Sequence, residues 1–578
     1  MTKDTISLEQ TFPAATEEQW REAALKALRG QPFDALLSTT MEGLELQPLY
    51  GPEQLADLEH VGGLPGQAPF VRGASAAGAS RVCWENRAVL ALPRTSHFRD
   101  AAAAELAGGA SGLGLVLDRA GRGGLDPDHG DAEGLVGQGG LPVACWQDLS
   151  LALEGVDLTE TPLTLLAGTS ALPAAALLFA MARERGLSPD GLRGGLAADP
   201  LGALAAGGSL PLPFQAALDE LVDLASWCVA NAPDVAAVVV DVAPYHDGGA
   251  DAVQELGFAM ATAAEYMTAL TDGGLDPDDA AAQVSFSFAV GTRLLSEVAK
   301  LRAARLLWSQ VAAAFGCSDS ARAMKLHART SRWNKAWRDG HNNLLRATLE
   351  TFAAAAAGAD AVSVAPHDEA WTPGDATSRR LARNVQVLLR EETGLGHVVD
   401  PAGGTYAVEA ITDGLAREAW ALLQEVERRG GMGAALLDGF PQRKVADLAA
   451  ARAEKIAAGA EALIGVNRYA REDEQLPEAA LEDMAGARFK RAAALTNHRK
   501  GRNEAALEQA RAALVAAVSG APGDRTAAAV DAACAGMTLG ELCAALRPDG
   551  APPTTAAPLP ARTGEQLFDD APAQGGDA

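Results

Sequence analysis

Side chains that could move a proton follow two of the apolar segments of this sequence. Tyr245, His246 and Asp247 come at the end of the apolar run that begins at residue 236, and the polar group 366–369 ends the run that begins at residue 361. A histidine at the end of a buried strand could donate a hydrogen bond to a substrate carbonyl or transfer a proton. A histidine that only fixes the loop fits the same spacing, so both roles stay open.

Other common kinds of catalytic site are not found in the sequence. No lysine stands in a phosphate-binding G-x-x-x-x-G-K-[ST] loop, no G-x-G-x-x-G follows a predicted strand, and no H-E-x-x-H pair indicates zinc. The nine histidines are dispersed along the chain. The six cysteines form no C-x-x-C pair, so we expect reduced, structural thiols and no metal site.

The charge balance and the hydropathy pattern restrict the partners. Lys and Arg number 48 and Asp and Glu 75, which gives a formal net charge of −27. This charge repels nucleic-acid phosphates and anionic membrane surfaces, so we expect neither as a partner. The N-terminal segment is polar and has no apolar core of a signal peptide, which favours a cytoplasmic protein. Residues 163–182 carry no charge, but Gly168 and Pro173 divide them into a strand and a helix rather than a membrane span.

The elements that must position these side chains are short apolar runs alternating with long helical segments, between about residues 85 and 410. Runs that are apolar on both faces are typical of parallel strands covered by helices. Here they are 112–118, 162–168, 236–246, 283–291, 361–368 and 397–404. Their number and span favour a TIM-type (β/α) eight-stranded barrel over a doubly wound sheet, with the working face at the carboxyl ends of the strands.

Composition divides the chain into four parts. Residues 1–75 form a polar N-terminal arm with one helix near 16–28, and residues 76–411 form the barrel. Residues 412–547 are rich in Ala, Glu and Arg and form a helical linker region. Residues 548–578 are rich in Pro, Ala and Gly, which predicts a disordered tail.

Five long motifs resemble the methylmalonyl-CoA mutase family, in the family's order. They are PLYGPEQLADLEHVGGLPGQAPFVRG (48–73), DVAPYHDGGADAVQELGFAMA (241–261), EVAKLRAARLLW (297–308), ARTSRWNKAWRDGHNNLLRATLE (328–350) and RRLARNVQVLLREETGLGHVVDPAGGTYAVE (379–409). The resemblance implies a barrel through which the CoA ester passes, a helical linker and a flavodoxin-like cobalamin domain. It also implies the interconversion of (R)-methylmalonyl-CoA and succinyl-CoA by radicals from adenosylcobalamin.

The chain departs from the family at positions that carry this chemistry. In active members a tyrosine of the arm lies over the corrin, and ungapped counting places Val89 there, with Arg87 retained beside it. The histidine of the active Leu-His-Thr-Asn segment becomes Ser363. The glutamine of Gln-Thr-Ser-Gly-Trp becomes Arg329, which brings a fixed positive charge. Tyr245 and His246 still resemble the Tyr-His pair of active members.

The cobalamin domain is also expected to be absent. The family's cobalt-ligating Asp-x-His-x-x-Gly motif is not found in the sequence. Residues 538–548 resemble the segment that opens the cobalamin domain, and only residues 549–578 follow them, too few for a five-stranded α/β domain.

Together these departures resemble the small (beta) subunit of heterodimeric members. This implies no catalytic, cofactor-binding or metal-binding residue on this chain, and the large (alpha) subunit as its heterodimer partner. Adenosylcobalamin is then expected on the large subunit, with none bound by this chain alone. One alternative is an active acyl-CoA mutase barrel that uses a cobalamin domain on a separate chain. Another is a module that binds a CoA ester or allosteric ligand without an obligate partner.

Overall fold

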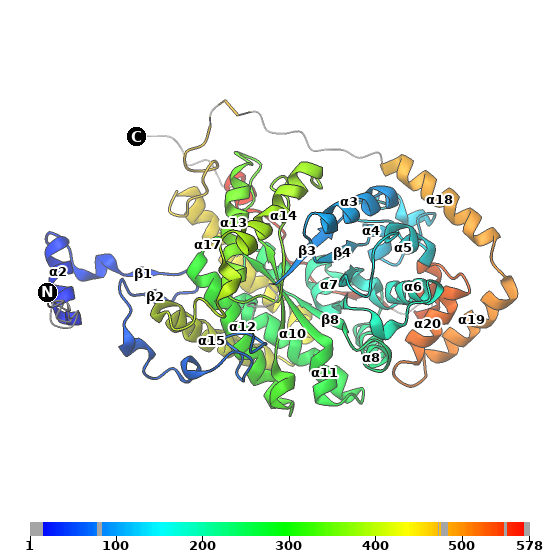
Figure 1. Ribbon diagram of the computed structural model, residues 1–578, viewed down its shortest axis with the longest axis horizontal. Helices are drawn as coiled ribbons and strands as arrows, with labels where there is room; N and C mark the ends of the chain where they lie inside the picture. Colours follow the sequence, from blue (N-terminus) through cyan, green and yellow to red (C-terminus); the bar gives the residue numbers. More distant parts are fainter. Residues whose placement is uncertain (1–14, 78–83, 472, 475–483, 548–551, 571–578) are drawn as a thin grey trace, which may run out of the picture.

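Eight parallel strands close into a barrel at the centre of the molecule (Figure 1). The computed structural model describes residues 15–77, 84–471, 473–474, 484–547 and 552–570. Around the ring the strands are β10 (Lys325–Thr330), β11 (Ala361–Ser363), β3 (Glu85–Leu90), β4 (Gly112–Val116), β5 (Leu163–Leu166), β6 (Gly194–Ala198), β8 (Val235–Asp241) and β9 (Val284–Val290). The predicted TIM-type barrel is confirmed.

Helices follow the strands and surround the barrel, as the right-handed βα unit requires. The helices that form the outer layer are α3 (Thr95–Ala107), α5 (Trp146–Ala152), α6 (Ala171–Glu184), α8 (Phe214–Asn231), α10 (Ala252–Asp272), α12 (Leu294–Ala314), α13 (Asn342–Ala356) and α14 (Ala376–Glu391). Shorter helices stand in the connections: α4 (Arg119–Arg122), α7 (Pro200–Gly207), α9 (Ala243–Asp247) and α11 (Pro277–Gln283).

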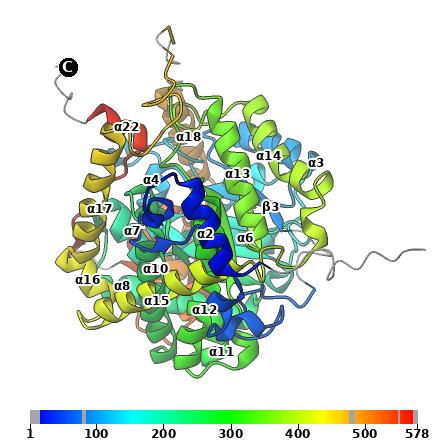
Figure 2. The ribbon, with the colours of Figure 1, turned by 90° about the vertical axis from the view of Figure 1, so that its left-hand side faces the viewer.

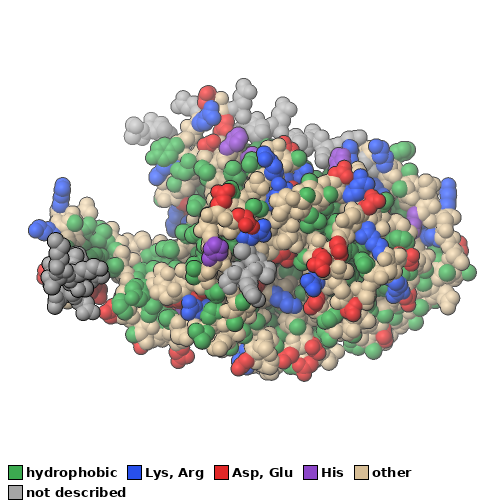
Figure 3. Space-filling model, viewed as in Figure 1, with side chains coloured by type: hydrophobic (Ala, Val, Ile, Leu, Met, Phe, Trp, Pro, Cys, Tyr) green, Lys and Arg blue, Asp and Glu red, His purple; other side chains and the backbone are tan. Residues whose placement is uncertain are grey.

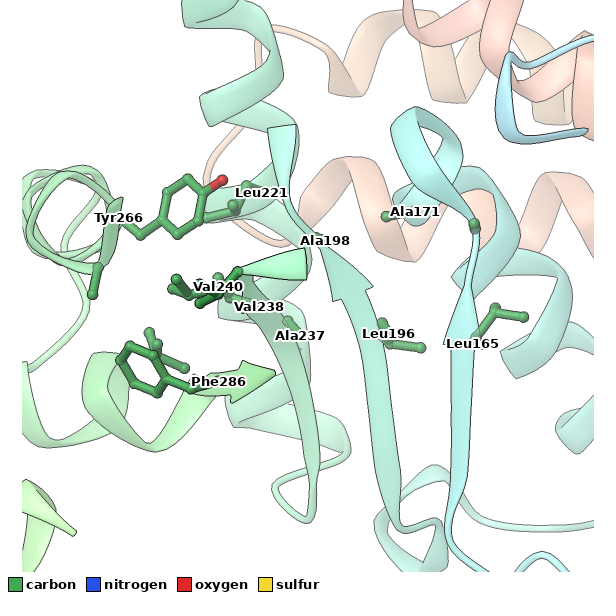
Figure 4. Close-up of a cluster of buried hydrophobic side chains, with 14 of the residues drawn as sticks. Leu165, Ala171, Leu196, Ala198, Leu221, Ala237, Val238, Val240, Tyr266 and Phe286 are labelled. Carbon is green, nitrogen blue, oxygen red and sulfur yellow. The ribbon is translucent and has the colours of Figure 1, made fainter. Parts of the chain in front are cut away.

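The main core lies between the strands and the surrounding helices. Leu165, Leu196, Val240 and Phe286 of the strands are almost completely buried and belong to one cluster with helix residues such as Tyr266 (Figure 4). The alternating residues face the lumen of the barrel, because successive side chains of a strand point to opposite sides. The core therefore holds the strands rigidly and leaves the lumen side chains free to form a site.

Small residues line part of the lumen. Gly112 and Gly114 of β4 pair in register with Arg87 and Val89 of β3. A Cβ atom on Gly112 would lie 2.1 Å from Glu85 Oε1, and one on Gly114 would lie 2.8 Å from Val89 Cγ2. The side chains of β3 therefore occupy the space beside β4, and only glycine fits opposite them.

The strands predicted at 112–118, 162–168, 236–246, 283–291 and 361–368 correspond to β4, β5, β8, β9 and β11. The strand predicted at 397–404 is wrong. Leu395–His397 is a short 3-10 helix, and the following residues form turns, with Val398 60% exposed. Residues 163–182 form β5, a 3-10 turn and most of α6, and no described helix is long and apolar enough to cross a membrane.

The N-terminal arm extends away from the barrel (Figures 1 and 2). Its helix α2 (Glu17–Ala27) contains no buried residue and confirms the helix predicted near 16–28. A two-stranded ribbon of β1 (Ser38–Thr39) and β2 (Glu45–Leu46) follows it. Trp20 and Phe33 contact each other edge to face, with ring centroids 5.9 Å apart, so α2 packs on the residues that follow it.

Two ion-pair contacts anchor the end of the arm on the barrel helices. His60 Nε2 lies 3.0 Å from Glu409 Oε2, and Arg72 Nε donates to Asp400 Oδ2 at 2.9 Å. Arg302 of α12 joins the two contacts, because it donates to Glu409 Oε1 at 2.6 Å and also to Asp400. We call these five residues the arm anchor.

The region after the barrel is helical, as predicted from its composition. It contains α15 (Tyr406–Glu427), α16 (Met432–Asp438), α17 (Phe440–Ala457), α18 (Met484–Lys500), α19 (Glu504–Ala517), α20 (Asp524–Cys534) and α21 (Leu539–Leu546). Helix α15 packs on α10 and α12, α17 contacts α10 through Phe440, and α20 packs on α6 and α8 (Figure 1).

The C-terminal segment differs from the disordered tail that its composition predicts. Residues 554–555 form strand β12, which pairs antiparallel with β7 (Ser209–Leu210), and Gly564–Asp569 forms helix α22. Leu559 and Leu567 are buried against the body of the protein. Prolines restrict the unfolded chain and thereby lower the entropy lost on docking, so a Pro-rich segment can be ordered with few contacts. Residues 548–551 and 571–578 lie outside the described residues.

Candidate functional site

The carboxyl ends of the barrel strands bring together the polar side chains that the sequence singles out. His246 stands on α9, directly after β8, and is buried. Its Nδ1 lies 2.8 Å from Glu255 Oε1 on α10, and its Nε2 lies 2.7 Å from Ser331 Oγ after β10. Because a carboxylate accepts, Nδ1 carries the proton and Nε2 accepts from the serine.

A buried lysine fixes the charge state of this histidine. Lys300 Nζ donates to Glu255 Oε2 at 2.9 Å and to the Ala289 carbonyl at 2.8 Å, and it lies 2.7 Å from Glu297 Oε2. Burial, reinforced by the charge of Lys300, lowers the pKa of His246 to about 3. Burial raises the pKa of Glu255 to about 7, although Lys300 opposes the rise. His246 is therefore a neutral imidazole at pH 7, held in place by its neighbours.

Arg329 of β10 faces α9 across the mouth of the barrel. Its guanidinium donates to Asp247 Oδ2 at 2.6 Å and to the carbonyl of Thr330 at 3.1 Å. Both side chains of the pair are mostly buried. The fixed positive charge predicted for this position is thus present, and Asp247 neutralises it inside the site.

Ser363 of β11 contacts a histidine that sequence reasoning missed. Ser363 Oγ lies 2.8 Å from His327 Nε2, and Ser287 Oγ of β9 lies 3.0 Å from His327 Nδ1. Burial, with the charges of Arg87 and Arg329, lowers the pKa of His327 well below its usual value. The sequence feature that could have identified His327 is its position two residues before Arg329 in β10, which puts both side chains on the same face of the strand.

The two predicted positions on β3 lie on the other side of the ring from β8. Arg87 donates to both carboxylate oxygens of Glu85, at 2.7 and 3.0 Å. Val89 is 40% exposed, more than any other residue of β3. An aliphatic side chain therefore stands at the open end of the lumen, and it has no hydrogen-bonding group.

Tyr245 lies apart from the other predicted positions. Its side chain is 2% exposed and belongs to the main core, with its ring centroid 5.2 Å from that of Phe258 on α10. Burial raises the pKa of its hydroxyl well above the usual value. The structure therefore brings together His246, Arg329 and Ser363 with their partners, and it places Tyr245 behind them.

The charged side chains of this site are paired within the chain, although Asp247 Oδ1 is buried without a hydrogen-bond partner among the described residues. Each ionised lumen side chain described above has an opposite charge within hydrogen-bonding distance, in the pairs Arg87–Glu85, Arg329–Asp247 and Lys300–Glu255. Among the residues that the structure describes, no three His, Cys, Asp or Glu side chains are grouped to hold a metal. The described cysteines are all free thiols, and Cys83 lies outside the described residues.

Comparison with known proteins identifies the family. The family model for methylmalonyl-CoA mutase matches residues 39–551, which is most of the chain. The chain belongs to the methylmalonyl-CoA mutase family. Members of this family are isomerases that depend on cobalamin.

Relatives include proteins named methylmalonyl-CoA mutase and proteins named as its small or large subunit. Methylmalonyl-CoA mutase of Escherichia coli (strain K12) is 32% identical over 534 residues, covering 92% of this chain and 74% of that protein. Methylmalonyl-CoA mutase small subunit of Streptomyces virginiae is 38% identical over 474 residues, 81% of this chain and 72% of that protein. Methylmalonyl-CoA mutase large subunit of the same organism is 31% identical over 540 residues, 92% and 74%.

At the mouth of the barrel both ring nitrogens of His246 and of His327 take part in hydrogen bonds. The Nδ1 atom of His367, in the polar group after β11, is buried and has no hydrogen-bond partner among the described residues. Val89 has no aromatic face to lie against a corrin.

Proposed function

We propose that this chain is the non-catalytic small subunit of a heterodimeric methylmalonyl-CoA mutase. It supports, in the cytoplasm, a large subunit that interconverts (R)-methylmalonyl-CoA and succinyl-CoA. The observation that carries the proposal is the closed pairing of charges at the mouth of the barrel. Arg329 is paired with Asp247, and His246 is held by Glu255 and Ser331, so these side chains are held by partners in the same chain without a substrate.

The substituted positions support the same proposal. Val89 replaces a stacking tyrosine, and Ser363 replaces an imidazole with a hydroxyl that is engaged by His327. Arg329 places a fixed charge where a neutral radical pair would need shelter. Each loss removes a separate contribution, so restoring one of them leaves the others missing.

Exposed apolar side chains on the N-terminal arm favour the existence of a partner chain. Leu25, Leu36 and Leu49 of the arm are exposed, and α2 buries none of its residues in this chain. Hydrophobic side chains are visible on the part of the arm next to the barrel (Figure 3). Burying such apolar side chains stabilises an assembly by about 25 cal/mol for each Å² removed from water. We propose that the arm binds the large subunit, which also carries the adenosylcobalamin. The pair of Streptomyces virginiae proteins named as small and large subunits provides the precedent.

A second candidate is an active acyl-CoA mutase barrel whose cobalamin domain is a separate chain. The exposure of Val89 favours it, because the lumen is open to solvent on the β3 side. The two proposals differ in where cobalamin binds and in whether this chain turns over substrate.

Native mass spectrometry after co-expression with the cognate large subunit distinguishes them. We expect a one-to-one complex that carries one cobalamin. Two cobalamins in each pair, or a homodimer that ignores the large subunit, would overturn the small-subunit proposal. The double variant Trp20→Ala, Phe33→Ala should weaken the complex, whereas Leu151→Ala, an exposed leucine on α5, serves as the matched control.

A further inference from the structure

The C-terminal segment 552–570 follows the rim of the barrel at the carboxyl ends of its strands. We call this segment the strap. Its backbone N–H groups donate to carbonyls in the connection after β6: Thr554 to Leu212 at 3.3 Å, Ala556 to Gly208 at 2.8 Å and Leu559 to Ala205 at 2.8 Å. Pairing with β7 therefore fixes the first part of the strap in register.

The strap then crosses the connections after β8 and β10. The N–H of Arg562 donates to the carbonyl of Asp247 at 3.2 Å, and the N–H of Gly564 donates to the carbonyl of Trp333 at 2.7 Å. Asp247 is the partner of Arg329, so the strap holds the backbone of a residue at the mouth of the barrel. Main-chain bonds to the loops after β6, β8 and β10 make this a specific contact rather than a chance crossing.

Helix α22 ends the strap in a built site (Figure 2). Glu565 is buried and accepts from the N–H groups of Trp337 at 2.5 Å and Arg338 at 3.2 Å, and from the Arg338 guanidinium at 2.9 Å. Leu567 packs in a separate apolar cluster with Trp333, Ala336, Ile456, Leu463 and Val466.

Three glycines allow this close approach. A Cβ atom on Gly208, whose φ is +70°, would lie 2.8 Å from the carbonyl oxygen of Ala556. A Cβ on Gly248 would lie 3.1 Å from the carbonyl oxygen of Pro560, and one on Gly564 would lie 3.0 Å from the ring of Trp333. The barrel loops and the strap therefore fit each other at backbone distance.

We infer that the strap remains bound to the rim over β6, β8 and β10. It thereby prevents other domains and chains from binding to this part of the barrel's carboxyl face. A domain that docks on this face would have to displace five main-chain hydrogen bonds and the buried Glu565. On the opposite side of the ring, the described residues leave Val89 of β3 40% exposed. The inference stands on the contacts of this chain and does not require the small-subunit proposal.

Hydrogen exchange followed by mass spectrometry tests the inference on the full chain, alone and in complex with the cognate large subunit. We expect the strap amides of residues 556, 559, 562 and 564 to exchange at least about a hundredfold more slowly than an unstructured chain. We expect the same protection in the complex. Fast exchange in the isolated chain, or protection lost when the large subunit binds, would overturn it. Failure to form a complex would instead count against the small-subunit proposal.

The variant Glu565→Gln provides a second test. The amide NH₂ of glutamine cannot accept a hydrogen bond, so either Trp337 or Arg338 loses its acceptor. Their backbone amides should exchange about tenfold faster than in the wild type. Glu454→Gln, an exposed glutamate on α17, is the control and should leave these rates unchanged. Equal rates in both variants would show that α22 is not docked on the rim.

Discussion

Replacing Glu409 by glutamine should release the arm anchor and lower the free energy of unfolding. Glu409 is 1% exposed and accepts from His60 Nε2 at 3.0 Å, from Arg302 at 2.6 Å and from the N–H of Gly404 at 2.8 Å. Burial alone would raise the pKa of its carboxyl, but these hydrogen bonds and the charge of Arg302 lower it to about 2. The charged form is thus much better bound than the neutral form.

The magnitude follows from this pKa. One pKa unit corresponds to about 1.4 kcal/mol, so a fall from 4.5 to about 2 is worth about 3 kcal/mol at pH 7. Since the pKa in the folded state is lowered, this stability is present above about pH 4.5 and is lost as the pH falls through 2. The difference between wild type and Glu409→Gln should therefore be about 3 kcal/mol at pH 7 and about half of that at pH 3.

Urea denaturation followed by circular dichroism at pH 7 and pH 3 measures both values. Glu454→Gln is the control, and an exposed substitution of this kind should change the free energy of unfolding by less than about 0.5 kcal/mol. A difference below about 1 kcal/mol at pH 7, or one that does not change with pH, would refute the reasoning. Either result would mean that the arm is not held by a charged, desolvated network.

Three further predictions concern the barrel. Val89→Tyr should leave the isolated chain without methylmalonyl-CoA isomerisation in a coupled assay, because Ser363 and Arg329 stay substituted; measurable turnover would contradict the proposed function. Leu115→Ala should lower the free energy of unfolding by about 2–5 kcal/mol in denaturant titrations, because Leu115 is completely buried in the main core; a loss below about 1 kcal/mol would show that the site collapses to fill the cavity. His246 should remain neutral between pH 8 and pH 5 in NMR titrations, because burial and Lys300 lower its pKa to about 3. Because the pKa is lowered in the folded state, the contribution of His246 to stability is lost as the pH falls from about 6.5 to 3. A titration midpoint near 6.5 would show that the imidazole is accessible.

The barrel could be predicted from the sequence because five of its eight strands, β4, β5, β8, β9 and β11, have a recognisable apolar pattern. Strand β8 is apolar except for its last residue, and in β9 only Ser285 and Ser287 interrupt the apolar residues, which is typical of a covered parallel sheet. Strands β3, β6 and β10 were missed for a physical reason. Glu85 and Arg87 of β3 and His327 and Arg329 of β10 face the lumen, where polar side chains pair with one another, and β6 begins with two glycines.

The site was partly predictable for the same reason. The position of His246 follows from the end of the strand predicted at β8, whereas Arg329 is identified by the resemblance to the mutase family. Their partners Glu255 and Ser331 come from other elements, so their contacts depend on the three-dimensional packing. The prediction of a strand at 397–404 is wrong because no packed element covers its apolar residues, as the exposure of Val398 shows. The strap escaped prediction because Pro-rich composition is shared by disordered chains and by docked extended segments.

The arm has a consequence for the fate of the chain in the cell. The tip of the arm, which carries α2, stands clear of the barrel with apolar side chains in solvent (Figure 1), whereas Glu42, Leu44 and Leu46 nearer the barrel contact it. Exposed, weakly packed segments are where proteases cut and chaperones bind. We expect an orphaned chain to be degraded and a paired chain to survive. The amount of this protein would then follow the amount of its partner, which would give the cell matched quantities of two polypeptides without matched synthesis.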